Sequence, residues 1–496
     1  MLTPRQHVTD ELATRFAQIR EDLEISEEFS PEALALAEER AALGIEQFTE
    51  QVDSDGTPRF RDRRDIELAS IDPEGSLDLD QAFAIERVSG ADRSAETVSD
   101  AAYVLRYAIA DVGSWVRPGD AIDVEARRRG MTVYSPDQRI PLHPPVLSEG
   151  AASLLAGRDR PAVLWTIDIT ADGDIGSIAV ERAIVRNRRA LTYREVQEAL
   201  DSDTTDDQFL LLRELGTVLI AAETRRGGIS LELPEQSVER VEGHYEVRYD
   251  AAYEVESFNA QLSLNCGMAA ARLMIANGVG ILRTLPPAEP GVFDSLRISA
   301  ATLGVDWPAE MGYADWVRSL DATTPEGAAL MNLAARTLRG SDYLPFDGRL
   351  PDEHHHTAIA APYAHVTAPL RRLVDRFANE CVLAAMQHRR PHAWALDALD
   401  DLPAIMARTG SLASRVDRAA VDLAEAAALL HLVGTEFDTT VTAAKKGVAT
   451  LLLRDPAVIH TIEADLPIGT TVRVRLVAAS LAGPEVAFEL VHAGTN

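Results

Sequence analysis

Cysteine is scarce in this sequence of 496 residues, since only Cys266 and Cys381 are present and they lie far apart. Two isolated cysteines form neither a disulfide framework nor a cysteine-rich metal site, so we expect a reducing compartment, the cytoplasm. No apolar run is long enough to cross a bilayer. The segment Met1–His7 lacks the basic and then apolar layout of a signal peptide. These absences predict a soluble cytoplasmic protein with no membrane partner.

Positive charge is also in short supply, because 48 lysines and arginines face 78 aspartates and glutamates, for a formal net charge of −30. Polyanions are bound by basic surfaces, so this balance argues against a nucleic-acid partner. Net charge, however, governs solubility and long-range steering and does not describe a single groove. The arginines are clustered, and each cluster is either a solvated helix face or part of a basic groove. The clusters are Arg127–Arg129, Arg186 with Arg188 and Arg189, Arg225–Arg226, and Arg371 and Arg372 with Arg376.

The order of strand and helix signals predicts the fold class. Short helices are expected over residues 1–60, where Ser30 caps a helix that starts at Pro31. Short runs rich in Val, Ile and Tyr then predict strands, and helices follow them. We therefore expect an α+β fold. A small helical region (1–60) precedes a mixed-sheet central domain surrounded by helices (61–432), and a small five-stranded β-barrel (433–496) follows.

Local signals give the expected bounds of individual elements. Thr192 and Glu195 form a capping box ahead of a helix, and Gly227 stops the next one. The expected helices include 207–224, 257–277 and 411–432. The expected strands are 66–70, 78–86, 103–112 and 163–170 in the central domain, and 437–441, 448–453, 471–476 and 486–490 in the barrel.

Three carboxylates, those of Asp72, Asp78 and Asp80, gather around one turn. Asp78 and Asp80 alternate with Leu77 and Leu79, so on an extended segment both acids lie on one face. Converging carboxylates repel one another, and hard oxygen ligands of this kind suit Mg²⁺ or Mn²⁺. The alternative is an acidic surface loop, with at most an adventitious Ca²⁺ site, because short acidic motifs are common.

A second informative stretch lies near Arg371. Thr367 is the expected N-cap of a helix and Pro369 lies in its first turn, so Arg371 and Arg372 oppose the helix dipole. A bound anion would reverse that effect, because free backbone N–H groups and two guanidinium groups form a phosphate cradle. The alternative is an ion pair between Arg371 and Asp375. Metal ligands early in the chain and a phosphate cradle late in it predict metal-assisted hydrolysis of a phosphodiester.

From about residue 64 to its C-terminus the chain resembles the ribonuclease II / ribonuclease R family of exoribonucleases. The matching segments are Asp72–Ala82, Ala108–Val112, Val116–Gly119, Asp123–Tyr134, Ile140–Leu142, Leu147–Ser148, Arg225–Pro234 and Tyr363–Asp375. The resemblance implies an RNB-type catalytic domain that hydrolyses single-stranded RNA from the 3′ end with Mg²⁺ (or Mn²⁺) and releases nucleoside 5′-monophosphates. It also implies that the C-terminal barrel is an OB-type RNA-binding domain, and we expect a monomer.

The resemblance implies roles for particular residues. Asp72, Asp78 and Asp80 match three of the family's four active-site aspartates, with Asp80 also catalytic. The fourth is Gln81 here, whose amide oxygen reaches a metal without bringing charge, so we expect weaker metal binding. A related function stays open: an RNA-binding protein of the same fold with a weakened catalytic centre.

Further implied residues would hold the substrate. Arg371 matches the arginine that binds the scissile phosphate, with Arg372 beside it. Tyr134 matches the tyrosine that packs on the terminal nucleotide, and stacking suits a nuclease that tolerates any base; a core tyrosine is the alternative. Glu256 falls near a carboxylate pair of the family, although its neighbour is Ser257.

The second departure from the family concerns the N-terminal region. The family often carries two cold-shock RNA-binding domains before the catalytic domain, and about 60 helical residues are too few to hold them. We therefore expect a shortened form that binds RNA with less surface. The same departure keeps a third function open, a metal-dependent hydrolase of small phosphoesters.

Overall fold

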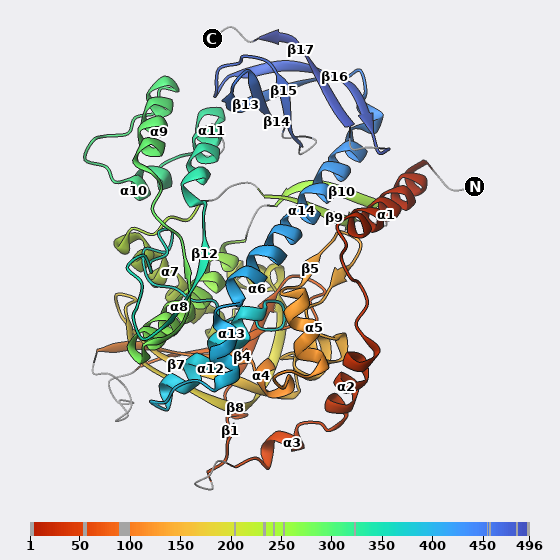
Figure 1. The fold of residues 1–496 in the computed structure, drawn as a ribbon. Helices are drawn as coiled ribbons and strands as arrows, with labels where there is room; N and C mark the ends of the chain where they lie inside the picture. The colour runs from red at the N-terminus through yellow and green to blue at the C-terminus, as the bar shows by residue number, and fades with distance from the viewer. Residues whose placement is uncertain are drawn as a thin grey trace.

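A computed structural model gives the fold (Figure 1). The C-terminal strands lie at one end of the molecule, the central domain lies at the other, and the long helix α14 (Leu402–Leu429) runs between them. No helix among the described residues is both long enough and apolar enough to span a membrane. The structure describes residues 4–52, 57–88, 100–202, 205–231, 235–241, 244–250, 253–321, 324–453, 455, 458–482 and 485–493.

The N-terminal region is helical, as predicted, with α1 (Pro4–Asp22), α2 (Pro31–Ala42) and α3 (Glu46–Thr49). The Ser30 side chain caps α2 by accepting a hydrogen bond from the N–H of Ala33 at 3.2 Å. α1 packs against α14, whereas α2 packs against α5 (Ala121–Arg129). The N-terminal segment therefore follows the outside of the molecule from α14 down to the far end of the central domain (Figure 1).

The central domain is built on a mixed sheet, which confirms the predicted α+β class. In the described part of the chain the strand order is β1-β8-β2-β3-β4-β7, and β8 also pairs with β7, so the sheet closes on itself. β1 and β2 run parallel to β8. The strands are β1 (Arg61–Asp62), β2 (Leu68–Asp72), β3 (Gln81–Arg87), β4 (Ala101–Ala110), β7 (Asp159–Thr170) and β8 (Ile175–Thr192).

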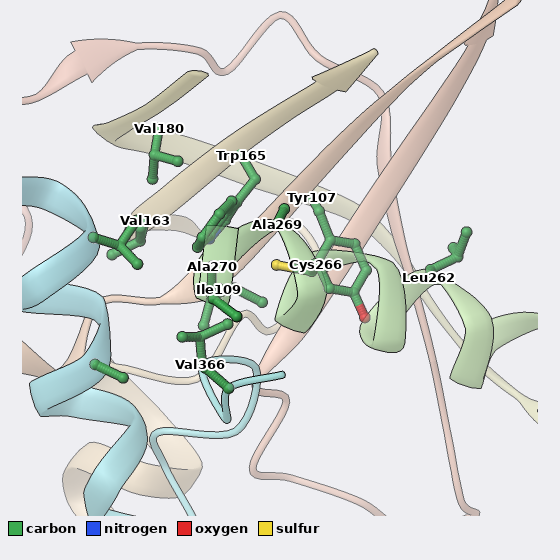
Figure 2. Close-up of a cluster of buried hydrophobic side chains, with 14 of the residues drawn as sticks. Tyr107, Ile109, Val163, Trp165, Val180, Leu262, Cys266, Ala269, Ala270 and Val366 are labelled. Atoms are coloured by element: carbon green, nitrogen blue, oxygen red, sulfur yellow. The ribbon is translucent and has the colours of Figure 1, made fainter. Parts of the chain in front are cut away.

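Helix α8 (Glu254–Asn277) packs on one face of this sheet (Figure 2). Tyr107 and Ile109 of β4 and Trp165 of β7 lie in one buried cluster with Ala269 and Ala270 of α8. Small side chains on the helix allow close approach to the sheet, and each large apolar side chain contributes roughly 1.5–3 kcal/mol when buried. This packing fixes the edge of the sheet at which β2 ends and β3 begins.

Several predicted helix signals are present as expected. The Thr192 hydroxyl accepts a hydrogen bond from the N–H of Glu195 at 3.2 Å, and the Glu195 carboxylate accepts one from the N–H of Thr192 at 2.8 Å. Gly227 ends α7 in the left-handed conformation that glycine adopts without strain. The remaining helices of the central domain are α4 (Val112–Trp115), α6 (Tyr193–Asp201), α7 (Asp207–Arg226), α12 (Leu373–Met386) and α13 (Ala393–Leu399).

Two hairpins and a helical insertion surround the domain. β9 (Glu235–Val241) pairs with β10 (His244–Asp250), and β11 (Val279–Thr284) pairs with β12 (Asp342–Asp347). The helices between β11 and β12 have their own core, in which Trp307 stacks on Trp316 with ring centroids 4.0 Å apart. These helices are α9 (Pro290–Thr302), α10 (Tyr313–Arg318), α11 (Pro325–Ala334) and the 3₁₀ turn η2 (Ala335–Leu338).

The C-terminal strands form an antiparallel half-barrel with the order β15-β14-β13-β16-β17 in the described residues. The sequence predicted four of these strands to within four residues at every end, and it did not identify β15. The half-barrel follows α14 and the short turn η3 (Leu430–Leu432). Its strands are β13 (Glu436–Lys445), β14 (Val448–Leu453), β15 (Val458–Glu463), β16 (Thr471–Ser480) and β17 (Glu485–Ala493).

Candidate active site

The acidic motif lies at one edge of the central sheet. β2 ends at Asp72 and β3 begins at Gln81, and because the two strands are antiparallel these ends lie side by side. Asp80 is only 2% exposed, and its backbone carbonyl accepts a hydrogen bond from Ala110 of β4 at 2.8 Å. Burial of Asp80 contradicts the alternative of an acidic surface loop.

Asp80 contacts the arginine segment that lies much later in the chain. The backbone N–H of Leu370 donates to the Asp80 carboxylate at 2.7 Å. The Nε of Arg371 lies 3.2 Å from the other carboxylate oxygen, and the Arg371 side chain remains 48% exposed. The structure thus brings an acid from the early motif and a guanidinium group from the late motif into one site.

The predicted helical start at Thr367 is wrong, because α12 begins at Leu373. The Thr367 hydroxyl contacts the Ser263 hydroxyl at 2.9 Å instead of capping a helix. Residues 368–372 form a turn whose N–H groups are used within the protein: that of Ala368 donates to the Asp375 carboxylate at 2.8 Å. The predicted cradle of free backbone N–H groups is therefore absent from this described segment.

Arg372 and Arg371 have different surroundings. The guanidinium of Arg372 makes two hydrogen bonds to the Asp375 carboxylate, at 2.5 and 2.8 Å, and the Asp375 side chain is completely buried. The expected alternative pairing of Asp375 with Arg371 is thus made by Arg372. Arg371 is the arginine left with half of its side chain accessible to a substrate.

Tyr134 is held next to Arg371 by backbone contacts. Helix α5 ends at Gly130, where the backbone takes a φ of +68°. Beyond it the N–H of Thr132 donates to the carbonyl of Arg371 at 2.9 Å, and the N–H of Leu373 donates to the carbonyl of Gly130 at 2.9 Å. Tyr134 lies two residues further on and is 51% exposed, so it is not a core tyrosine.

A short hairpin carries Tyr134 and contributes a further arginine to the site. β5 (Val133–Tyr134) pairs with β6 (Arg139–Ile140), and Tyr134 lies directly opposite Arg139. Arg139 forms an ion pair with Asp78 and a second one with Glu149 at 2.9 Å. Arg139 was not predicted from the sequence, because its partner lies 61 residues away and no local pattern indicates the pairing.

Two carboxylates of the site, those of Asp72 and Asp80, are destabilised when charged. Burial raises the pKa of Asp80 to about 8, although the neighbouring Arg371 opposes the rise. Burial likewise raises the pKa of Asp72 to about 6, with Arg371 opposing the rise and Asp78 reinforcing it. Partial burial and the nearby Asp78 raise the pKa of Tyr134 to about 12, so its hydroxyl stays protonated at neutral pH.

The carboxylate oxygens of the site are the kind of ligand that a hard divalent cation prefers. One carboxylate oxygen of Asp72 and one of Asp80 are buried and accept no hydrogen bond, and a cation would compensate both. Among the described residues, however, no group of three or more His, Cys, Asp or Glu side chains lies close enough to bind a metal. The amide oxygen of Gln81 already accepts a hydrogen bond from the Tyr107 hydroxyl at 2.6 Å.

Glu256 has a structural contact that the sequence did not indicate. Its carboxylate accepts a hydrogen bond from the N–H of Tyr253 at 2.9 Å and so caps α8. Two further residues near the site were missed: the amide of Asn259 donates to the Tyr193 hydroxyl at 3.2 Å. Burial raises the pKa of Tyr193, and the nearby Asp72 and Glu256 act in the same direction. Only the fold brings these side chains together.

Comparison with known proteins identifies the family. The profile described as RNB domain matches residues 60–388, and the profile described as RNase II-type exonuclease C-terminal S1 domain matches residues 435–491. The chain is 29% identical over 350 residues to Exosome complex exonuclease RRP44 homolog A of Arabidopsis thaliana, an alignment that covers 66% of this chain and 36% of that protein. It is 28% identical over 353 residues to Ribonuclease R of Escherichia coli (strain K12), covering 67% of this chain and 41% of that protein. The chain thus spans less than half the length of both relatives.

Solved structures share the fold. Mycoplasma genitalium RNase R in complex with ribose methylated single-stranded RNA superposes with a TM-score of 0.82 at 17% identity, over 97% of this chain and 78% of that one. Yeast Ssd1, described as a pseudonuclease, superposes with a TM-score of 0.68 at 16% identity, over 86% of this chain and 53% of that one. Because the RNB profile matches more than half of the sequence, the chain belongs to the RNB-domain ribonuclease family and carries a C-terminal S1 domain of the RNase II type.

Proposed function

We propose that the protein is a divalent-metal-dependent exoribonuclease that degrades single-stranded RNA from its 3′ end and releases nucleoside 5′-monophosphates. The observation that carries this proposal is the contact between buried Asp80 and half-exposed Arg371 at the sheet edge. It combines an acid suited to a metal with a cation suited to a phosphate. The single-stranded RNA in the Mycoplasma genitalium RNase R structure supports the substrate class.

Different residues of this chain bind the phosphate and the terminal nucleotide. The exposed guanidinium of Arg371 donates hydrogen bonds to the phosphoryl oxygens, where negative charge increases during hydrolysis. The exposed ring of Tyr134 stacks on the 3′-terminal nucleotide and fixes its position without reading the base. Arg372 supports the turn through Asp375 and does not contact the phosphate.

A cation completes the acidic part of the site. Asp72 would hold it through its buried oxygen that accepts no hydrogen bond, and Asp80 through the oxygen that lies 3.2 Å from Arg371. Asp78, the third acid, is paired with Arg139. When bound, Mg²⁺ or Mn²⁺ supplies positive charge and a more acidic water. Gln81 contributes no charge, so this protein needs more metal than one with a fourth aspartate would.

A second function has its own support. An RNA-binding protein with a weakened centre is favoured by the bond between Gln81 and Tyr107, which occupies the amide oxygen, and by the pseudonuclease Ssd1, which shares the fold. Hydrolysis of small phosphoesters has less support, because the chain carries an S1 domain after the catalytic domain. Monomeric state and cytoplasmic location stay predictions.

One assay separates these functions. RNA labelled at its 5′ end is incubated with protein and Mg²⁺ or Mn²⁺, with a chelator, and with the variants Asp80→Asn and Asp294→Asn. Asp294 is an exposed residue of α9 and controls for loss of one carboxylate. We expect the RNA to be shortened from its 3′ end. The chelator and Asp80→Asn should abolish this shortening, whereas Asp294→Asn should not affect it. RNA that is bound but not shortened would favour the RNA-binding protein. If the RNA is neither bound nor shortened, the small-phosphoester hydrolase remains as the function.

A further inference from the structure

The hairpin β5–β6 needs support from outside itself. Each of its strands has only two residues, and the turn between them is closed by hydrogen bonds between Ser135 and Gln138, at 3.0 and 3.2 Å. A two-stranded hairpin of this size is not stable alone. It nevertheless carries Tyr134 on one strand and Arg139 on the other, so its position sets the position of both side chains.

Arg20, near the end of α1, forms hydrogen bonds with the turn of this hairpin. Its guanidinium donates two hydrogen bonds to the carboxylate of Asp137, at 2.7 and 3.0 Å, and a third to the hydroxyl of Ser135 at 3.0 Å. The remaining Nε donates to Glu27 at 2.6 Å. Arg20 is 3% exposed, so the turn is joined to the N-terminal segment by a buried, two-pronged ion pair.

The residues after Arg20 hold the base of the same hairpin. Leu23 and Ile25 pack on Val133 and Ile140, the apolar residues of the two strands, and Val416 of α14 closes the cluster. These contacts lie beneath the strands, whereas the Arg20 contacts lie at the turn. The N-terminal segment therefore touches the hairpin at both of its ends.

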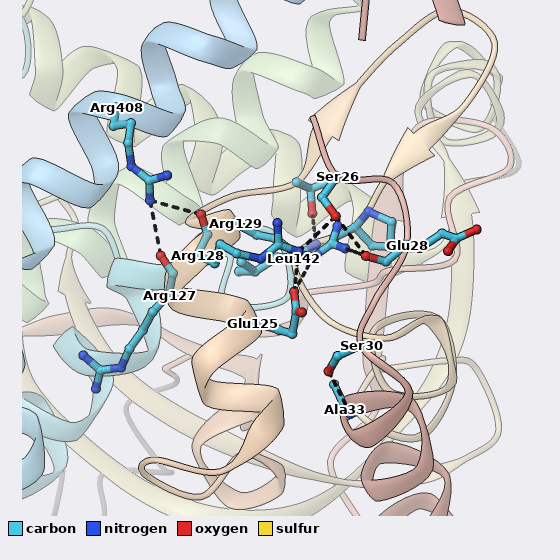
Figure 3. Close-up of polar contacts among 12 residues, drawn as sticks. Ser26, Glu28, Ser30, Ala33, Glu125, Arg127, Arg128, Arg129, Leu142 and Arg408 are labelled. Atoms are coloured by element: carbon cyan, nitrogen blue, oxygen red, sulfur yellow. Dashed lines mark hydrogen bonds and ion pairs between the residues drawn. The ribbon is translucent and has the colours of Figure 1, made fainter. Parts of the chain in front are cut away.

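The segment then follows helix α5, which leads into the hairpin (Figure 3). The Ser26 hydroxyl accepts a hydrogen bond from Arg128 at 3.1 Å, and the carbonyl of Glu28 accepts one from Arg129 at 2.6 Å. Both arginines also contact the Glu125 carboxylate, which orders them at the end of the helix. Two of the clustered arginines are thus engaged with the N-terminal segment.

The other end of the segment is fixed to the rest of the molecule. Leu12 and Phe16 of α1 are buried against Ala420 and Leu423 of α14 and against Leu481, which follows β16 in the half-barrel. An arginine on a helix anchored in this way is held by contacts that do not involve the hairpin. Segment 11–29 therefore links the half-barrel to the hairpin of the candidate site.

We propose that segment 11–29 is a structural part of the active site and that Arg20 is a positioning residue for the 3′-terminal nucleotide. Arg20 fixes the turn through Asp137, and the turn fixes Tyr134 and Arg139. The role of Arg20 in positioning the nucleotide rests on the proposed function, whereas its role in supporting the hairpin does not. Removing Arg20 loosens the hairpin and leaves the carboxylate of Asp137 without its partner.

The first experiment requires no RNA and no activity. Hydrogen exchange is measured over peptides covering residues 131–142 in the wild type, in Arg20→Met and in Arg40→Met. Arg40 is the matched control, because it is also a buried N-terminal arginine, paired with Asp120 at 2.5 Å, but it does not touch the hairpin. We expect faster exchange at residues 133–140 in Arg20→Met alone. Unchanged protection there, or the same increase in Arg40→Met, would overturn the proposal.

Two related variants keep the test interpretable if Arg20→Met fails to fold. Asp137→Asn removes the carboxylate charge from the turn while keeping its shape, and Arg20→Lys keeps the charge but loses the paired geometry. We expect Asp137→Asn to reproduce the faster exchange and Arg20→Lys to restore part of the protection. If Asp137→Asn folds and shows wild-type protection, the ion pair does not support the hairpin and the proposal fails.

The second experiment uses RNA and a double-mutant comparison. Arg20→Met should raise KM for single-stranded RNA roughly tenfold by misplacing the stacking ring. Once Tyr134→Ala has removed that ring, adding Arg20→Met should change KM less than about twofold, because the two residues act through one contact. Fully additive effects would contradict the proposed role. If the wild type does not cleave RNA, the proposed function fails, and the exchange experiment still decides whether segment 11–29 supports the hairpin.

Discussion

The amide oxygen of Gln81 accepts a hydrogen bond from the hydroxyl of Tyr107, 2.6 Å away on the neighbouring strand. Tyr107 is completely buried, so this bond gives the hydroxyl an acceptor inside the core. Gln81, which we predicted to stand at the position of the fourth family aspartate, is therefore held in place by a contact within the sheet. It is not free to turn fully toward a metal.

Gln81→Asp should strengthen metal binding. A carboxylate at this position adds negative charge beside Asp72 and Asp80, which favours a divalent cation. We expect the Mg²⁺ concentration for half-maximal activity to fall several-fold. It is measured by titrating Mg²⁺ into the cleavage assay, with Gln81→Asn as the uncharged control. An unchanged Mg²⁺ requirement would place the cation away from this residue.

Arg371→Ala should slow turnover by orders of magnitude while RNA binding changes little. Its half-exposed guanidinium is the group available to a phosphate, and loss of a donor that acts mainly in the transition state lowers the rate more than the affinity. Single-turnover rates and binding of labelled RNA to the metal-free protein separate the two effects. Equal losses in rate and affinity would contradict the assigned role.

Arg372→Met should act on stability. Arg372 pairs with a carboxylate that is completely buried, and removing one partner leaves the Asp375 charge unpaired. Loss of such a pair costs roughly 3 kcal/mol. We expect a lower urea midpoint for Arg372→Met than for Arg371→Ala, because the Arg371 side chain is half-exposed and makes a single, longer contact with Asp80. A stable Arg372→Met protein that has lost its turnover would make Arg372 a substrate-binding residue.

Tyr134 should act through its ring and not through its hydroxyl. Its pKa of about 12 keeps the phenol protonated near neutral pH, so no ionised form takes part. Tyr134→Phe should therefore retain the length of the final RNA fragment, whereas Tyr134→Ala should lengthen it. The fragments are compared on a sequencing gel after complete digestion. A changed fragment in Tyr134→Phe would show that the hydroxyl contacts the RNA.

Local signals in the sequence predicted the parts of the fold that short-range chemistry determines. The cap at Ser30 and the capping box at Thr192 use side chains within three residues of the groups that they satisfy. The long strand β8 was missed, because its arginines at 182, 186, 188 and 189 interrupt the apolar pattern. Those arginines pair with acids elsewhere, such as Asp111 and Asp159, which no local window reveals.

The candidate site follows the same rule. Chemical complementarity of the two motifs, together with the family resemblance, predicted that Asp80 and Arg371 belong to one site, and the structure brings them into contact. The start of α12 was predicted at Thr367 from the pattern of Thr367 and Pro369. That pattern does not include Asp375, whose carboxylate accepts a hydrogen bond from the N–H of Ala368 and holds the segment as a turn. Arg139 and Arg20 were missed for a physical reason: a buried ion pair depends on the fold, not on spacing.

His143 should make the protein sensitive to acid. It is 1% exposed, and burial, reinforced by the nearby Arg376, lowers its pKa to about 3. The unfolded chain has a histidine pKa of about 6.5, so between these values the unfolded state binds a proton that the folded state excludes. The histidine contribution to stability therefore falls as the pH drops below about 6.5, by roughly 2–3 kcal/mol at about pH 4.5.

The comparison of wild type with His143→Gln isolates this effect from other titrating groups. Asp72 and Asp80 have raised pKa values, and their protonation favours the folded state as the pH falls, so the wild-type profile alone mixes opposite trends. Urea unfolding of both proteins at about pH 7 and about pH 4.5 gives the free energy of unfolding at each pH. We expect His143→Gln to be the less stable protein at neutral pH and to lose that disadvantage in acid. A stability difference that is the same at both pH values would mean that His143 takes up its proton without leaving the fold.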